Sequence, residues 1–231
     1  MNRYKIYAPH KCGSSILRKM TANITNVEIW PNNDFLISTD TGDAKINFSR
    51  RFDKKIHKED SLIFIPRNPI AMCISAYYSF GYTHAQPRGM SKDKFVSYRE
   101  RILKQGLQTF VEKNINEQSE FIESILHYNH CNKTIIPYEL MVNNFNDFLK
   151  EYLNAINMNS KYESAYARWS KEFSPIKDRS DLIVSKGIKP HKRTTDIYEW
   201  KQKLDQVQLQ NILEQYPIIN EYCQLLSAYN L

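Results

Sequence analysis

The sequence predicts an α/β fold in which a central, mostly parallel sheet is flanked by helices. Short apolar, β-branched segments alternate along the chain with longer segments of helical periodicity. This alternation is typical of parallel strands joined by helices. The 231 residues are 42% hydrophobic and 25% charged, an ordinary globular balance. With only 6 Gly and 9 Pro, long linkers are not expected, so we expect a single domain over residues 1–231.

Several short segments have the composition of strands. They are rich in β-branched or aromatic residues and are bounded by Asn, Asp, Pro or Lys. In parallel sheets, ligands bind at the carboxyl ends of the strands, so the loops that follow these segments are the places to look for a site. The expected strands are residues 4–8, 27–30, 35–39, 61–66 and 134–138.

Longer segments with helical periodicity follow these strands. Ser14 opens the first as an expected N-cap, and Pro69 suits the first turn of the second. Pro217 is expected to interrupt the last one. The expected helices are residues 14–22, 69–80, 92–128, 145–157 and 203–228.

Composition narrows the location of the protein. No apolar run approaches the ~18 residues that a membrane span needs, and the N-terminal residues lack the apolar core of a signal peptide. The 4 cysteines lie far apart, which indicates reduced thiols instead of a disulfide framework. We therefore expect a cytoplasmic protein without a membrane span.

The chain is basic, with a formal net charge of +7 and a pI of about 9.1. This balance fits an anionic small molecule, a nucleic acid or a membrane surface as partner. The 15 tyrosines are dispersed and not interleaved with one basic stripe, so we expect no nucleic-acid partner. The charge occurs in short groups, namely Arg50-Arg51 with Lys54-Lys55, and Lys186, Lys189 and Lys192-Arg193.

The first candidate site is the stretch "APHKCGSSILRKM", residues 8–20. Gly13 allows close approach of the backbone to a phosphate, and Ser14 and Ser15 offer donors at a helix N-terminus. In nucleotide hydrolases the lysine follows the second glycine of G-x-x-x-x-G-K-[ST], whereas Lys11 precedes the glycine here. The alternatives are an anion-binding loop and a plain turn capped by Ser14.

The second candidate site is "IFIPRNPIAMCISAYYSF", residues 63–80. Arg67 ends an apolar strand, and Ser75 lies eight residues further on, about two helical turns later. An arginine fork and a helix hydroxyl can converge on a phosphate. A serine bonded to its own helix backbone is the alternative for Ser75.

Together, "PHKCGSSIL" and "RNPIAMCISAYYSF" resemble the motifs of sulfotransferases that use 3′-phosphoadenosine 5′-phosphosulfate, PAPS. The first is similar to that family's 5′-phosphosulfate loop, and the second to its 3′-phosphate motif. "IIPYELM" (135–141) and "KPHKRTTDIYEWKQKL" (189–204) are similar to two later segments of the family. The resemblance spans residues 4 to about 204 and implies a three-layer, P-loop NTPase-like fold.

The resemblance also implies a role for each matching residue. Lys11 would bridge the 5′-phosphate and the transferring sulfuryl group, and the loop would cradle the 5′-phosphate. Arg67 and Ser75 would hold the 3′-phosphate, and Tyr138 would contact adenine. The product would be adenosine 3′,5′-bisphosphate, PAP, and no metal is expected. The implied cofactor-binding residues are Lys11, Cys12, Gly13, Ser14, Ser15, Arg67, Ser75, Tyr138, Lys192 and Arg193.

An acceptor hydroxyl or amine, on a small molecule or a carbohydrate, requires a general base. Asp40 is the first choice because it ends an expected strand and would point toward the cleft; Asp43 and His84 are the other candidates. One alternative function is a P-loop-type kinase or phosphotransferase, which should carry lysine after the glycine and carboxylates for Mg²⁺. Another is a basic nucleotide-binding protein without catalysis.

Overall fold

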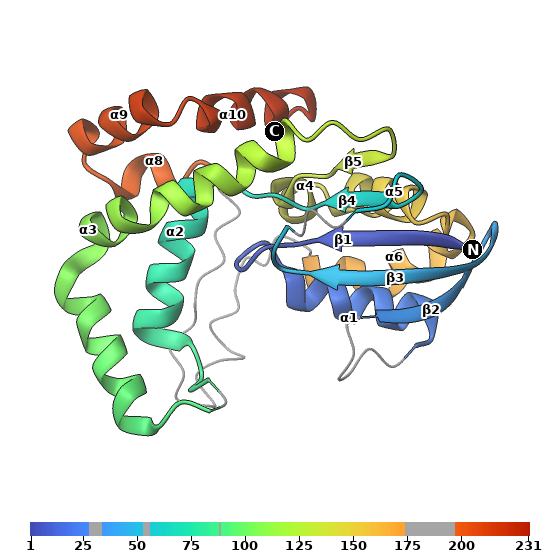
Figure 1. Cartoon of the computed structure of the whole chain (residues 1–231), viewed down its shortest axis with the longest axis horizontal. Helices are drawn as coiled ribbons and strands as arrows, with labels where there is room; N and C mark the ends of the chain where they lie inside the picture. The colour runs from blue at the N-terminus through green and yellow to red at the C-terminus, as the bar shows by residue number, and fades with distance from the viewer. Residues whose placement is uncertain (28–33, 53–55, 88, 174–196) are drawn as a thin grey trace. The chain divides into compact units, whose positions relative to one another are not determined.

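The computed structural model describes residues 1–27, 34–52, 56–87, 89–173 and 197–231 (Figure 1). The chain divides into two compact units. The first unit comprises Met1–Arg67, Glu123–Pro175 and Leu225–Leu231, and the second comprises Asn68–Ile122 and Ile176–Gln224. Most of the expected strand 27–30, together with Lys192 and Arg193, lies outside the described residues.

The first unit contains a five-stranded sheet in the order β2-β3-β1-β4-β5 (Figure 1). Neighbouring strands are parallel except for β2, which is antiparallel to β3. The predicted α/β class, with a central and mostly parallel sheet flanked by helices, is therefore confirmed. The strands are β1 (Asn2–Tyr7), β2 (Asp34–Thr39), β3 (Gly42–Ser49), β4 (Ser61–Phe64) and β5 (Lys133–Ile135).

Helices of the first unit pack on one face of this sheet. Alternate residues of β1, including Tyr4 and Ile6, are buried in the same apolar cluster as Leu17 and Met20 of α1, because successive strand residues point to opposite faces. Helix α5 contributes Phe148 and its neighbours to that cluster. The helices are α1 (Ser14–Thr25), α4 (Tyr138–Asn143), α5 (Phe145–Ala155) and α6 (Tyr162–Phe173), with the short 3₁₀ turn η2 (Asn159–Lys161) before α6.

The other face of the sheet carries a cluster of aromatic rings. Tyr7 and Phe64, on the adjacent strands β1 and β4, stack with their centroids 5.0 Å apart. Phe52 makes edge contacts with both rings and with Tyr128. Such contacts add to the stabilisation from burial, so both faces of the strands that lead to the candidate loop are held in place.

The second unit is helical. Asn68 caps its first helix by accepting hydrogen bonds from the N–H groups of Ile70 and Ala71, and Pro69 occupies the first turn as expected. The long helix α3 is broken at Gly106, where φ is 76°. The elements that begin here are α2 (Pro69–Tyr78), the π-helical turn η1 (Ser79–Thr83), α3 (Lys92–Leu126), α8 (Trp200–Lys203), α9 (Gln206–Gln215) and α10 (Ile218–Ala228). None of the described helices is both long enough and apolar enough to cross a membrane.

Two of the sequence-based expectations need correction. Ser14 is not the N-cap of α1: the cap is Gly13, and Ser14 is the first helical residue. The expected strand 134–138 ends at Ile135, because Pro137 precedes a new helix that begins at Tyr138. The interruption near Pro217 is confirmed by the break between α9 and α10.

A buried carboxylate anchors the start of β4 to β1. Asp60 is fully buried; the Lys5 ammonium lies 3.2 Å from one of its oxygens, and the His57 N–H donates to the same oxygen at 2.9 Å. Arg3 Nε lies 3.0 Å from the other oxygen, without the alignment of a hydrogen bond. Burial alone would raise the pKa of Asp60, but these hydrogen bonds and charges outweigh it and hold the pKa below its ordinary value.

We expect Asp60→Asn to lower the free energy of unfolding by about 1.5–3 kcal/mol at pH 7, because the partly exposed cations Arg3 and Lys5 lose their hydrogen-bonded counter-charge. The folded-state pKa of Asp60 is depressed, so its contribution is complete above the unfolded value of about 3.9 and is lost as pH falls through the folded value. Urea unfolding at neutral and acidic pH should show the difference between the two proteins shrinking in acid. Glu59→Gln, which alters an exposed neighbour, should change stability little at either pH; an equal effect of both substitutions would contradict this account.

Candidate functional site

Three sequence segments meet at the carboxyl ends of three adjacent parallel strands. The backbone ties these ends together: Ile65 N–H donates to Tyr7 O at 2.8 Å, and Ile136 N–H donates to Phe64 O at 2.9 Å. The loop of residues 8–13 follows β1, Arg67 follows β4, and Tyr138 follows β5. From β1 the chain first adds β2 and β3 on one side and then crosses to add β4 and β5 on the other side. In α/β proteins, ligands bind at the carboxyl ends of the strands where the strand order reverses in this way.

The loop between β1 and α1 contains two residues with a left-handed backbone conformation. Lys11 and Gly13 have φ values of 75° and 71°, in the left-handed region that non-glycine residues rarely adopt. No side chain caps α1. In the described part of the chain, no acceptor bonds the backbone N–H groups of Ser14 and Ser15. These donors, at the positive end of the helix dipole, can bind an anion.

Arg67 braces this loop. Its Nη1 donates to the carbonyl oxygen of Lys11 at 3.0 Å, and its guanidinium lies 4.7 Å from the ring centroid of Tyr138. Tyr138 is fixed in turn, because its N–H donates to Pro66 O at 2.8 Å. The sequence suggested Arg67 as a phosphate ligand but gave no sign of its bond to Lys11, which lies 56 residues away.

Gly13 lies directly beneath α4. A Cβ atom placed on Gly13 would come within 2.5 Å of Met141 Cε and 3.1 Å of Tyr138 Cε2. The position therefore requires glycine for two reasons, its left-handed φ and the lack of space. Nothing in the sequence indicated that Met141 lies next to the loop. It does so because α4 follows β5, the strand after β4 in the sheet.

Cys12 is a packing residue of the loop. It is fully buried, and burial raises the pKa of its thiol well above the ordinary value; Arg67 opposes this shift and the buried Glu139 adds to it. A thiol in this state is not a nucleophile. The Cys12 side chain is therefore suited to anchoring the loop in the core.

The structure brings together seven of the residues expected at the site. Ser75, on α2, and His84, after η1, belong to the second unit, so their pairing with the loop stays a prediction. Lys192 and Arg193 lie outside the described residues. The residues that meet in the first unit are Lys11, Cys12, Gly13, Ser14, Ser15, Arg67 and Tyr138.

Asp40 lies at the end of the sheet where β1 begins, whereas the loop lies where β1 ends. The expectation that Asp40 points toward the cleft is therefore wrong. Asp40 follows β2, which runs antiparallel to its neighbour and so ends beside the beginning of β1; Asn2 hydrogen-bonds Thr41 there. The length of β1, about 17 Å, separates that turn from the loop. The same applies to Asp43.

Asp40 instead has a local structural role. Its carboxylate accepts hydrogen bonds from the hydroxyl of Ser160 and from the Ser160 N–H, the latter at 2.9 Å. The hydroxyl bond first, and then the backbone bond, lower the pKa of Asp40, which makes it a weaker base. The Asp40 N–H also donates to Asn157 O at 2.8 Å. These bonds fasten the β2–β3 turn to η2 and the residues between α5 and α6.

His84 lies in a turn that hydrogen bonds hold in place. Its Nδ1 lies 2.6 Å from the carbonyl oxygen of Ala85. A carbonyl can only accept, so in this contact Nδ1 is the donor. Arg99 fixes this turn by donating to the His84 carbonyl at 2.7 Å and to the Phe80 carbonyl at 3.3 Å.

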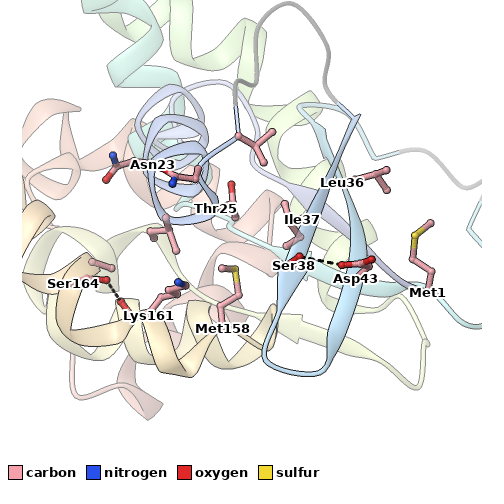
Figure 2. A pocket seen from close by; sticks show the side chains of 14 residues that line it. Met1, Asn23, Thr25, Leu36, Ile37, Ser38, Asp43, Met158, Lys161 and Ser164 are labelled. Carbon is pink, nitrogen blue, oxygen red and sulfur yellow. Dashed lines mark hydrogen bonds between the residues drawn. The ribbon is translucent and has the colours of Figure 1, made fainter.

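A pocket of about 590 Å³ lies at the opposite edge, next to the β2–β3 turn (Figure 2). Ser38 and Asp43, which hydrogen-bond at 3.0 Å, form one wall, and Lys161 and Ser164 form another. Thr25, at the end of α1, also lines it. Because α1 runs back along the sheet from the loop, this pocket is distinct from the loop site. Among the described residues, no group of three or more His, Cys, Asp or Glu side chains is placed to hold a metal ion.

Fold and site together describe an α/β protein with a left-handed, glycine-containing loop at the carboxyl ends of its parallel strands. No family model matches the chain, and no curated protein matches it by sequence. Among solved structures, it is similar to the crystal structure of the mouse sulfotransferase SULT7A1 complexed with PAP. That similarity has a TM-score of 0.44 and 14% sequence identity, and it covers 96% of this chain and 88% of the other.

Proposed function

We propose that the protein is a sulfotransferase that moves the sulfuryl group of PAPS to a hydroxyl or amine of a small-molecule or carbohydrate acceptor by in-line transfer. The two compact units would act together as one sulfotransferase domain. The 4 cysteines are free thiols, in keeping with the cytoplasm as the proposed location.

The proposal is supported by the way in which three separate motifs meet. The segments that resemble the family's 5′-phosphosulfate loop, 3′-phosphate motif and later tyrosine motif are far apart in the sequence. They are joined by the Arg67–Lys11 hydrogen bond, the Arg67–Tyr138 contact and the packing of Tyr138 on Gly13. A plain turn capped by a serine would require none of these contacts, and α1 has no such cap.

The donor set of the loop fits a phosphosulfate group. The N–H groups of Ser14 and Ser15 have no acceptor within the described residues, and they would hold the 5′-phosphate. Lys11 would neutralise charge that develops on the oxygen between phosphorus and sulfur, where PAPS supplies the reactive sulfuryl group. As in phosphoryl transfer, positioning and electrostatic stabilisation provide most of the rate enhancement in such a reaction.

Arg67 would have two roles in this arrangement. Its bond to the Lys11 carbonyl uses Nη1, and a guanidinium carries further N–H donors, which would bind the 3′-phosphate together with Ser75. Its position over Tyr138 would also hold that ring in place for adenine. The nucleotide would thus extend from the loop toward the β4 and β5 side of the sheet.

His84 is the proposed general base, because Asp40 and Asp43 lie at the wrong edge of the sheet. Its ring is oriented by the hydrogen bond from Nδ1 to Ala85 O, and histidine is the side chain that most often serves as a general base. A nucleotide-binding protein without catalysis is the second candidate function, because Asp40, the first choice of general base, does not lie near the loop. PAP binding without turnover of PAPS would favour this second candidate.

The proposal predicts a specific pattern of ligand stabilisation. PAP should raise the melting temperature far more than AMP, because only PAP carries the 3′-phosphate that Arg67 would bind, and ligand binding stabilises the native state by mass action. Thermal shifts at matched concentrations of PAP, AMP, ADP and ATP would measure this. A protein stabilised by ATP more than by PAP would contradict the proposal and favour a phosphotransferase.

Arg67→Ala tests the same site with its own internal control. The substitution should remove most of the difference in binding free energy between PAP and AMP. The expected loss is about 1.5–3 kcal/mol, for one hydrogen bond to a charged group. Comparing the two nucleotides within the variant cancels any change in its basal stability. A PAP preference that survives in Arg67→Ala would show that Arg67 only braces the loop.

A further inference from the structure

The pocket beside the β2–β3 turn is a second place in the first unit that suits a small molecule (Figure 2). Its volume of about 590 Å³ lies within the range of known small-molecule sites. All 14 residues that line it belong to the described part of the first unit. It lies where β1 begins, whereas the candidate loop lies where β1 ends, so a ligand in this pocket would be separate from the proposed nucleotide.

The pocket combines an apolar floor with two charged groups. The apolar side chains of Ile37, Met158 and Ala165 are only 4%, 1% and 3% exposed. Asp43, on β3, and Lys161, in η2, are exposed, and Figure 2 shows Met158 and Ile37 between them. The pocket therefore presents a negative group and a positive group on different sides of an apolar surface.

Neither of these charges is compensated by an ion pair. Among the ion pairs of the described residues, none includes Asp43 or Lys161. Ser38 donates to Asp43 at 3.0 Å, which leaves the negative charge in place. Lys161 contributes to lowering the pKa of Asp40, but the Asp40 carboxylate is hydrogen-bonded to Ser160. A ligand that carries one charge of each sign would supply a partner for both Asp43 and Lys161.

The hydroxyl groups of the pocket indicate which ligand groups they can bind. Three of them already donate their only hydrogen to the protein, so they have only acceptor lone pairs left for a ligand. The pocket is also lined by the last turn of α1 and its C-cap Asn26, the negative end of a helix dipole. Such a lining favours a ligand with a positively charged N–H donor group. The three bonds are Thr25 to Thr21 O at 2.8 Å, Ser38 to Asp43 at 3.0 Å and Ser164 to Lys161 O at 3.0 Å.

We propose that this pocket binds a small zwitterion of the amino-acid type with an apolar side chain. The ammonium group of the ligand would be bound by the Asp43 carboxylate and the hydroxyl acceptors, and its carboxylate by Lys161, through charge-assisted hydrogen bonds. Its apolar side chain would cover Ile37 and Met158 and so remove apolar surface from water. The inference does not depend on the proposed sulfotransferase function, because the candidate loop takes no part in it.

Three ligands of matched shape test the role of the two charges. L-Leucine carries both charges, 3-methylbutylamine lacks the carboxylate, and 4-methylpentanoate lacks the ammonium group. Each would be titrated into the full chain and followed by the NMR signals of the ligand. Leucine should bind saturably, and each of the other two should bind about tenfold or more weakly, because it loses one hydrogen-bonded charge pair.

Two variants assign each charge to its side chain. Asp43→Asn should weaken leucine binding about tenfold or more and leave the binding of 4-methylpentanoate unchanged, since the new amide can still accept from Ser38. Lys161→Gln should weaken leucine equally and leave 3-methylbutylamine unchanged. Both residues are exposed, so the melting temperature should stay close to that of the wild type. Glu163→Gln and Lys171→Gln are the matched controls, because both residues are exposed on α6 and do not line the pocket.

The adverse outcomes are distinct. The absence of a saturable leucine signal would overturn the proposal, and so would equal affinities for the three ligands, which would show an apolar surface without selection by charge. Leucine affinity that is unchanged in both pocket variants, or that falls as much in the controls, would also overturn it. Displacement of leucine by PAP would place leucine in the loop instead. Failure of the chain to bind PAP would remove the proposed function but leave the leucine titrations as they are.

Discussion

Lys11→Ala is expected to lower turnover by about 10³-fold, while the affinity for PAP falls much less. The reason is that the proposed contact of Lys11 is with charge that develops only in the transition state, and such interactions act on kcat more than on binding. A single electrostatic contact of this kind changes rates by about 10²–10⁵-fold in comparable enzymes. Initial rates at saturating PAPS, together with PAP titration, measure the two effects separately.

The backbone at Lys11 allows a second variant as a control. Because φ is 75° at this position, Lys11→Gly removes the same side chain and also relieves the left-handed strain. Both variants should lose the same turnover if the ammonium group is what matters. Lys19→Ala, on the exposed side of α1, should keep full activity. A Lys11→Ala enzyme with normal turnover would show that the lysine is not at the bridging oxygen.

The sequence predicts the strands and helices of the loop site well because local signals and tertiary structure agree there. The segment 4–8 is apolar and β-branched, the helix after it has regular spacing, and Pro69 starts its helix as expected. Strand β3 was not expected. Its burial alternates from residue to residue, which makes it less apolar in sequence than the central strands.

The direction of β2 explains the failed prediction for Asp40. Alternation of strands and helices favours a parallel sheet, and in that setting the end of a strand faces the ligand. However, only Asp40 and Thr41 separate β2 from β3, and strands joined by so short a turn must be antiparallel. The dipeptide Thr41-Gly42 was the available sign of a hairpin turn. Because the hairpin makes β2 antiparallel, Asp40 lies at the end of the sheet opposite to the loop.

Contacts across long sequence separations could not be predicted from the chain alone. The bond from Arg67 to the Lys11 carbonyl and the packing of Met141 on Gly13 depend on the order of β1, β4 and β5 in the sheet. Composition and spacing do not specify that order. The resemblance to a family suggested which segments form the site, whereas the structure shows how those within the first unit touch.

Gly13→Ala is expected to abolish most PAP binding, with a loss of affinity of at least about 100-fold. A Cβ atom at this position costs about 1–2 kcal/mol for the left-handed φ and collides with Met141 and Tyr138. The Met141 terminus can move, but the Tyr138 ring is held by Arg67, so the loop is the part that shifts. Its displacement misaligns the Ser14 and Ser15 N–H groups that would hold the 5′-phosphate.

Gly42→Ala separates loss of the site from loss of stability. Gly42 also has a positive φ, 110°, but a Cβ there meets nothing within 4 Å, and it lies at the opposite edge of the sheet from the loop. Both substitutions should lower the melting temperature through backbone strain, yet only Gly13→Ala should lose PAP affinity, as measured by calorimetric titration well below the melting transition. Equal loss of affinity in both variants would mean that general destabilisation accounts for the effect. Unchanged affinity in Gly13→Ala would mean that the loop does not bind the nucleotide.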